Sequence, residues 1–325
     1  MSGRGNRGVR IAIFGDGRWA AGTLRRFAAT RHEVVATVLR RSPSDSSLAE
    51  AAQEAGVPVL RPERANDPAF VAALRALVPD VIVSVAYDQI MRGDLRAVPR
   101  LGCLNAHAGA LPKYRGRNVI NWAIINGERE IGLTVHLIDE GIDTGDILLQ
   151  EALPIGWTDT YGDVLARVVD AIPPLVARAV DQLADGTASP RRQDHAAATY
   201  CGGRVDGDEW IDWSAPSRRV HNLVRGISRP GPGARTSMGG SPVIVWKAFY
   251  DPEWPEYLGT PGQVVGREAS GVLVKTGDSR LLIQEVQLPG GERLVPTWPI
   301  GTRLGPDMAT SLRALLRRLQ ALESS

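Results

Sequence analysis

Short apolar runs alternate with amphipathic stretches through the first half of the chain. Apolar, mostly β-branched runs predict strands at Arg10–Gly15, Glu33–Leu39, Val57–Leu60, Val81–Val85, Gly102–His107, Leu133–Ile138 and Ile147–Leu153. Apolar residues at helical spacing predict helices from Gly15 to Phe27 and at Leu48–Ala55, Asp67–Leu77, Asn118–Ile125 and Asp159–Leu183. Apolar strands that alternate with helices are typical of a mostly parallel sheet with both faces covered. We therefore expect an α/β domain.

Two local signals refine these helices. Asp67 is the expected N-cap of its helix, and Pro68 stands at the first helical position, where proline is favoured. Pro173 and Pro174 lie inside the longest predicted helix, where their rings remove backbone donors. We expect a kink or a break there.

The pattern changes after about residue 200. Five of the eight tryptophans lie in this part, together with a predicted helix at Pro216–Ile227. Short β-like runs separated by Gly/Pro turns follow at Val243–Ala248, Gly262–Gly266, Gly271–Thr276 and Leu281–Val286, and a terminal helix is predicted at Pro306–Leu322. These runs favour a small barrel or sandwich. We expect an α/β domain over 1–189, a linker over 190–200 within a polar stretch, and a β domain over 201–325.

Composition excludes several classes of protein. The chain has 325 residues, 23% of them charged, with a net charge of +2, which excludes a disordered chain and predicts no large nucleic-acid footprint. Cys103 and Cys201 are too few for a disulfide framework or a Cys-rich zinc site, and no metal site is predicted. No apolar run approaches the roughly 20 residues of a membrane span, and Met1–Arg10 lacks the apolar core of a secretory signal. We expect a cytoplasmic protein that does not bind membranes.

A Gly-rich turn follows the first predicted strand. Gly15–Ala20 matches G-x-G-x-x-A, which can place a dinucleotide phosphate at a helix N-terminus. The second strand ends at Arg40 and Arg41 instead of an acid, which would suit only a 2′-phosphate, as in an NADP-dependent reductase. The alternative is a tight strand-to-helix turn in which glycine allows close packing.

The most informative stretch runs from Asn105 to Gln150. Asn105 and His107 are two residues apart at the end of a predicted strand, so both side chains lie on one face at the sheet edge where ligands bind. Asp143 follows in a loop bounded by Gly141 and Gly145, which can bring its carboxylate to the same edge. A carboxylate beside an imidazole would raise the pKa of the imidazole. Such an imidazole can take a proton from an amine, and an amide N–H can stabilise an oxyanion, which predicts acyl transfer through a tetrahedral intermediate.

A structural interpretation of these residues stays open. A histidine near a strand end is often a satisfied core or surface residue, and an aspartate in such a loop can form an Asx turn. No partner is predicted for His32, His136, His195 or His221.

Three motifs in this stretch resemble those of the N10-formyltetrahydrofolate-dependent formyltransferases. That family has Asn-x-His, then Leu-Pro-x-x-[Arg/Lys]-Gly, then Asp-[Thr/Ala]-Gly. Here these are Asn105 and His107, Leu111–Gly116, and Asp143–Gly145, in order and at family spacing. The resemblance continues in the second half at Ile211–Trp213, His221–Arg225, Pro230–Ala234, Gly262 and Thr276–Asp278.

The resemblance implies a fold, a co-substrate and a site. The fold is a Rossmann-like domain followed by a smaller open β-barrel of the OB type, and the co-substrate is N10-formyltetrahydrofolate without a metal. Asn105, His107 and Asp143 match the family's catalytic triad. The positions that match the folate pocket are Gln89, Ile90, Met91, Arg117, Asp139, Glu140, Gly141 and Ile142.

The resemblance does not specify the acceptor amine. The stretch Tyr114–Trp122 looks more like members that formylate aminosugar nucleotides, so that acceptor is preferred, followed by an N-hydroxyornithine siderophore precursor. The alternative is methionyl-tRNA, although residues 201–325 carry only 15 Lys and Arg against 13 Asp and Glu. A local basic patch of Arg218, Arg219, Arg225, Arg229 and Arg235 could still serve initiator tRNA. The β domain could also be an acceptor platform or a homodimerisation module.

Overall fold

The computed structural model describes residues 8–305, and its contacts divide the chain into two compact units. Unit 1 comprises Met1–Ile120, Glu130–Pro154 and Leu165–Gly203, and unit 2 comprises Asn121–Arg129, Ile155–Val164 and Arg204–Ser325. Two short segments of the first half of the chain therefore belong to unit 2. The expected helix at 306–322 lies outside the described residues.

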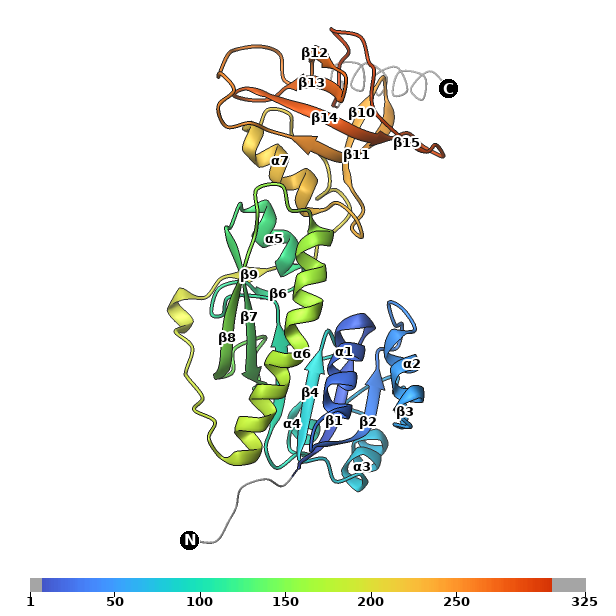
Figure 1. The fold of residues 1–325 in the computed structure, drawn as a ribbon, viewed down its shortest axis with the longest axis vertical. Coiled ribbons are helices and arrows are strands. Elements are labelled where there is room, and N and C mark those ends of the chain that lie inside the picture. Colours follow the sequence, from blue (N-terminus) through green and yellow to red (C-terminus); the bar gives the residue numbers. More distant parts are fainter. Residues whose placement is uncertain (1–7, 306–325) are drawn as a thin grey trace, which may run out of the picture. The chain divides into compact units, whose positions relative to one another are not determined.

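Unit 1 is built on a seven-stranded sheet in the order β3-β2-β1-β4-β5-β7-β8 (Figure 1). Its strands are β1 (Arg10–Gly15), β2 (Glu33–Leu39), β3 (Val59–Leu60), β4 (Val81–Val85), β5 (Cys103–His107), β7 (Glu130–Leu137) and β8 (Ile147–Pro154). The first five strands in this order pair in parallel, whereas β7 and β8 are antiparallel to their neighbours. The mostly parallel α/β sheet expected from the sequence is confirmed.

Helices cover both faces of this sheet. They are α1 (Gly17–Ala28), α2 (Ser47–Glu54), α3 (Pro68–Ala76), α4 (Gly93–Arg96) and α6 (Tyr161–Asp185). Most residues of α5 (Val119–Ile125) belong to unit 2. Ala12 and Phe14 of β1 pack with Val71 and Leu74 of α3 and Leu95 of α4. Since successive strand residues point to opposite faces, the other residues of β1 are buried on the side of α1. Burial on both faces explains the uninterrupted apolar runs.

The long helix α6 runs continuously through both prolines, so the break expected there is wrong. Around the prolines, Ile172, Leu175 and Val176 are almost fully buried, and this packing outweighs the lost backbone bonds. A Cβ atom on Gly22 would lie only 3.1 Å from Pro173 Cγ, which shows how closely α1 and α6 approach (Figure 1). The proline ring is thus part of the contact between these two helices.

The Asp67 cap of α3 is confirmed, because its Oδ1 accepts from Ala69 N at 2.9 Å.

Several short elements were not predicted from the sequence. The two-residue strands β6 (Arg115–Gly116) and β9 (Tyr200–Cys201) pair with each other, and neither has an apolar alternation to reveal it. The short helix α4 is another element without a periodic signal.

Unit 2 is an antiparallel β domain with one packed helix. Its main sheet has the order β10-β11-β14-β13-β12, with β15 paired to β14. The elements are α7 (Ser217–Gly226), β10 (Ala234–Met238), β11 (Ser241–Phe249), β12 (Val264–Glu268), β13 (Gly271–Lys275), β14 (Arg280–Gln287) and β15 (Arg293–Leu294). Residues Arg303 and Leu304 form bridges to Gln263 and Met238, which link the two ends of the sheet order as in an open barrel. Helix α7 packs Val220 and Val224 into the core of this domain.

No helix within residues 8–305 is long and apolar enough to cross a membrane.

Candidate functional site

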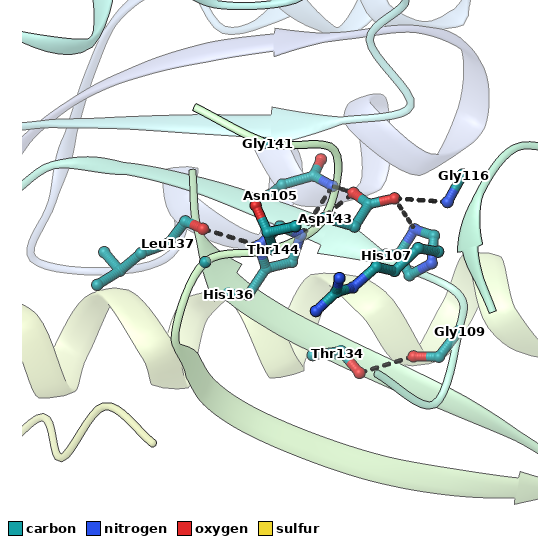
Figure 2. Close-up of polar contacts among 12 residues, drawn as sticks. Asn105, His107, Gly109, Gly116, Thr134, His136, Leu137, Gly141, Asp143 and Thr144 are labelled. Carbon is teal, nitrogen blue, oxygen red and sulfur yellow. Dashed lines mark hydrogen bonds and ion pairs between the residues drawn. The ribbon is translucent and has the colours of Figure 1, made fainter. Parts of the chain in front are cut away.

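Strand β5 presents two polar side chains at the carboxyl edge of the parallel strands. Asn105 and His107 lie on this strand between β4 and β7, and Asp143 lies in the loop between β7 and β8 (Figure 2). The three residues expected from the sequence therefore come from two segments of the chain, β5 and the loop after β7, and meet at one place. His107 is 7% exposed, so the site is screened from bulk water.

The carboxylate of Asp143 is the centre of this cluster. Its Oδ1 accepts from Asn105 Nδ2 at 3.3 Å, and its Oδ2 accepts from the Gly116 N–H at 2.8 Å. His107 Nδ1 lies 3.6 Å from Oδ2, and His136 Nε2 lies 3.5 Å from Oδ1 (Figure 2). Burial would raise the pKa of Asp143, but a hydrogen bond from His136 and the charge of His107, both of which act when the imidazoles are protonated, together with the Gly116 N–H lower it to about 2. Asp143 is therefore ionised throughout the physiological pH range.

A second histidine, His136, belongs to the cluster and was not assigned from the sequence. In the antiparallel register of β5 and β7, His136 lies opposite Asn105, and Thr134 lies opposite His107. His136 Nδ1 lies 2.8 Å from the Leu137 carbonyl, so this nitrogen carries the proton. In the neutral ring Nε2 then accepts from Asn105 Nδ2, 3.2 Å away. No local pattern marks His136, because its place opposite Asn105 depends on the register between β5 and β7.

The ring of His107 is fixed by a backbone carbonyl. His107 Nε2 lies 2.6 Å from Tyr114 O and must donate to it, because a carbonyl only accepts. Burial lowers the pKa of His107 and outweighs the charge of Asp143, which would raise it. The raised pKa expected from the sequence is thus wrong, because the expectation omitted desolvation. A neutral imidazole at pH 7 follows from the lowered pKa.

The turn after β5 is held from β7 and β8. Thr134 Oγ1 donates to Gly109 O at 2.7 Å, and Gln150 Nε2 donates to Thr134 Oγ1 and to Leu111 O, each at 2.9 Å. A Cβ atom on Gly109 would lie 2.5 Å from His107 Nε2 and 2.6 Å from Tyr114 O. Only glycine allows the turn to pass this close to the imidazole.

Arg115 and Gln193 hold the loop of Asp143 in place through a chain of hydrogen bonds. Arg115 is 1% exposed and donates through Nη2 to Gln193 Oε1 at 2.7 Å. It also reaches Tyr200 OH at 2.8 Å and His195 Nδ1 at 3.1 Å. Gln193 Nε2 in turn donates to the Asp143 carbonyl at 2.9 Å. No local pattern marks this pair, because its members lie 78 residues apart in the chain.

The first predicted folate segment lies beside the 63–66 loop. Gln89 Oε1 accepts from Ala65 N at 2.8 Å, so this side chain holds the loop. Met91 is buried in the core, whereas Ile90 is 62% exposed. Only Ile90 of the three thus offers an open apolar surface.

The second predicted folate segment is the loop that carries Asp143. Asp139 accepts from the Gly141 N–H and from the Thr144 hydroxyl, which folds the loop on itself. Glu140 is exposed and pairs with Arg96 at 3.4 Å, which connects the loop to α4. Ile142 is 55% exposed.

Arg117 adjoins the first predicted folate segment, and Ile138 connects the second to the same core. Arg117 Nη2 lies 3.5 Å from the Asp88 carbonyl, next to the first segment. Ile138, at the start of the second segment, packs against the core cluster that contains Met91. The two segments therefore lie close to one another beside the Asp143 cluster.

The Gly15 turn is filled by protein groups. Asp16 is 4% exposed, and its carboxylate accepts from the Ser44 N–H at 2.9 and 3.1 Å and pairs with Arg40 at 3.3 Å. A Cβ atom on Gly15 would lie 2.4 Å from Ala20 Cβ and 2.7 Å from Val85 O. A buried carboxylate would repel a dinucleotide phosphate, and the glycine is explained by packing. The geometry favours the tight turn over the reductase site.

The basic patch expected in the second half is partly consumed by internal contacts. Arg225 is 6% exposed and donates to the Gly156 and Asp159 carbonyls, each at 3.1 Å. Arg235 pairs with Glu209 at 3.2 Å.

In the part of the chain that the structure describes, no group of three or more His, Cys, Asp or Glu side chains could hold a metal ion.

Comparisons with known families match both halves of the chain. Residues 9–180 match the family described as Formyl transferase, and residues 205–298 match its C-terminal domain. The methionyl-tRNA formyltransferase of Pelotomaculum thermopropionicum is 35% identical over 88% of this chain and 93% of its own length. Those of Geobacter sulfurreducens and Anaeromyxobacter dehalogenans are 36% and 38% identical, over 92% and 87% of this chain and 97% and 93% of their own lengths.

Solved structures share the fold at lower identity. The sugar 3N-formyl transferase WlaRD, crystallised with dTDP and 5-N-formyl-THF, is 20% identical with a TM-score of 0.67, over 86% of this chain and 98% of that one. The N-formyltransferase from Helicobacter canadensis, in complex with folinic acid and dTDP-3-aminofucose, is 21% identical with a TM-score of 0.68, over 85% and 99%. At this identity the likeness concerns the fold alone.

Proposed function

Because this chain belongs to the formyl transferase family, we propose that it formylates the amine of methionyl-tRNA. It is a formyltransferase enzyme, and 10-formyltetrahydrofolate is its co-substrate. The acceptor is the proposed part. The main support for this acceptor is the similarity to methionyl-tRNA formyltransferases at 35–38% identity over 87–92% of the chain. This supports the acceptor that the sequence analysis ranked behind an aminosugar nucleotide.

The two predicted folate segments suit a folate. A pterin is a flat aromatic ring, and each segment presents one exposed isoleucine, Ile90 or Ile142, against which such a ring can pack. The exposed guanidinium of Arg117 lies beside the first segment, at the Asp88 carbonyl, and suits a carboxylate. The bound folate supplies the formyl group on its N10 nitrogen.

In this proposal His107 carries the proton of the reaction. Because its pKa is lowered, the ring is neutral at pH 7, and Nε2 holds its proton toward Tyr114 O. Nδ1 can therefore accept the proton that the amine loses as the new C–N bond forms. His107 returns that proton to N10 as the bond between N10 and the formyl carbon breaks. The Asp143 carboxylate, 3.6 Å from Nδ1, stabilises the imidazolium in between.

Asn105 donates to the formyl oxygen, where negative charge develops. In this structure its two amide protons are directed to His136 Nε2 and to Asp143 Oδ1. One of these bonds must lengthen or be shared when a formyl oxygen enters. His136 and Asp143 thereby hold the amide close to the geometry that the reaction uses.

Steady-state formyl transfer with three acceptors tests the assignment. Initiator tRNA charged with methionine, a dTDP-linked aminosugar and N-hydroxyornithine are each incubated with 10-formyltetrahydrofolate, with Asn105→Ala as the inactive control. We expect kcat/KM for methionyl-tRNA to exceed the other two by at least a hundredfold. A higher kcat/KM on the aminosugar nucleotide would overturn the proposed acceptor.

A further inference from the structure

Unit 2 contains a hollow of about 570 Å³ that is separate from the Asp143 cluster. Every residue that lines it belongs to this unit: Gly127, Glu128, Arg129, Ile155, Gly156, Trp157, Arg218, Arg225, Tyr250 and Pro252. Ligand pockets commonly measure about 300–1,000 Å³, so a nucleotide-sized group fits. The proposed chemistry at the Asp143 cluster gives this hollow no role.

Three guanidinium groups line the hollow, against one carboxylate, that of Glu128. Arg129 and Arg218 are exposed, and neither pairs with a carboxylate within residues 8–305. Arg225 is nine-tenths buried and uses Nε on Asn222 and Nη1 on two carbonyls, with none of these bonds made by Nη2. The hollow therefore has donors available for an anion.

These cations also repel one another. Burial lowers the pKa of Arg225 to about 10, and the charge of Arg218 contributes to lowering it. Like charges held together in a partly buried hollow are stabilised by an anion that binds between them. Guanidinium groups match the several oxygens of a phosphate better than a single-oxygen ligand.

An aromatic wall adjoins the guanidinium groups. The ring of Trp157 stacks on His221 at 5.1 Å and 26°, and its Nε1 donates to the Tyr250 carbonyl at 3.2 Å. The ring centroids of Tyr250 and Trp157 are 6.1 Å apart. The Arg218 guanidinium lies 5.9 Å from the Trp157 centroid. Trp157 is thus held rigidly, as a surface for a base or a ribose should be.

We propose that this hollow binds a backbone phosphate of the tRNA acceptor, with the adjoining nucleoside against Trp157 and Tyr250. The inference rests on the proposed function, since it names where unit 2 engages that acceptor. With a net charge of only +2, the chain has too little excess positive charge to bind RNA through a broad electrostatic surface. A local cluster of guanidinium groups can supply the phosphate contacts instead. The same chemistry would accept the phosphates of a nucleotide sugar, and the test distinguishes the two.

The test compares Arg129→Ala/Arg218→Ala with a matched control, Arg267→Ala, an exposed arginine of β12 outside the hollow. Equilibrium Kd values for labelled initiator tRNA are measured at several salt concentrations, and thymidine diphosphate is measured in parallel. We expect the double variant to bind tRNA at least tenfold more weakly and to lower the slope of log Kd against log salt by about one, since one phosphate contact is lost. The control should bind like the wild type, and the folate-dependent steps should keep their donor KM.

The outcomes separate the two proposals. If the wild type binds and formylates tRNA and the double variant binds it equally well, the phosphate site is wrong and the proposed function stands. If the wild type binds thymidine diphosphate but not tRNA, and the double variant loses that binding, the phosphate site stands and the proposed acceptor is wrong. Unchanged binding of both ligands in the double variant overturns the site.

Discussion

Replacing Asp143 with asparagine removes one charge at nearly constant shape and tests the centre of the cluster. The carboxylate accepts from Asn105 and from the Gly116 N–H, and it faces two imidazoles. An asparagine must turn its NH₂ group toward one of these donors. The pKa of Asp143 is about 2 instead of 3.8, and at 1.36 kcal/mol per pKa unit the folded state favours the ionised form by about 2 to 3 kcal/mol.

The pH dependence of this effect has a definite sign. A carboxylate whose pKa is lower in the folded state contributes stability above its unfolded pKa, and this contribution is lost as the pH falls through the folded pKa. Asp143→Asn should therefore lower the free energy of unfolding by about 2 to 3 kcal/mol at pH 7, and the deficit should shrink between about pH 4 and pH 2. Urea denaturation followed by circular dichroism measures both.

The same variant should lose formyl transfer. With the His107 imidazolium unsupported and Asn105 misdirected, kcat should fall at least about a hundredfold. Asp146→Asn, in the same loop, is the matched control, because no hydrogen bond of the Asp146 side chain is formed within residues 8–305. A kcat for Asp143→Asn within fivefold of the wild type, or an equal loss in Asp146→Asn, would refute this reasoning.

Three further predictions follow from the same contacts. His136→Asn should lower kcat about fivefold with little change in the donor KM, because one hydrogen bond that orients Asn105 is worth about 1 kcal/mol; a change in KM alone would contradict this role. Gly109→Ala should place a methyl group 2.5 Å from His107 Nε2 and lower kcat at least about tenfold while the fold, checked by circular dichroism, is kept; normal turnover would show that the turn is free to move. In the profile of kcat/KM against pH, the acid limb should have its midpoint below 6.5, because burial lowers the pKa of His107 and activity is lost only when the ring is protonated; a midpoint above 6.5 would contradict a buried base.

The parts of the site that follow one strand could be predicted from the sequence. Asn105 and His107 share a face because strand side chains alternate, and the carboxyl edge of a parallel sheet is where such a face meets a ligand. His136 could not be found in this way, since its partner depends on the register between β5 and β7. That register is fixed by pairing across the sheet and leaves no local pattern.

Buried polar contacts are the second kind of feature that could not be predicted from the sequence. Arg115 and Gln193 are 78 residues apart, and nothing local marks an arginine that is 1% exposed. The pKa of His107 was expected to rise because its charge partner could be read from motifs, whereas its burial could not. In α6, Pro173 predicted a break, but the packing against Gly22 that sustains the helix comes from another helix.

The central claim is that Asn105, His107 and Asp143 act together on a formyl group. Its most direct measurement is the single-turnover rate of transfer from 10-formyltetrahydrofolate to methionyl-tRNA in purified His107→Ala, with circular dichroism to verify folding. The account predicts a rate at least about a hundredfold below that of the wild type, with the donor still bound. A folded His107→Ala enzyme that transfers the formyl group at a near-normal rate would contradict it.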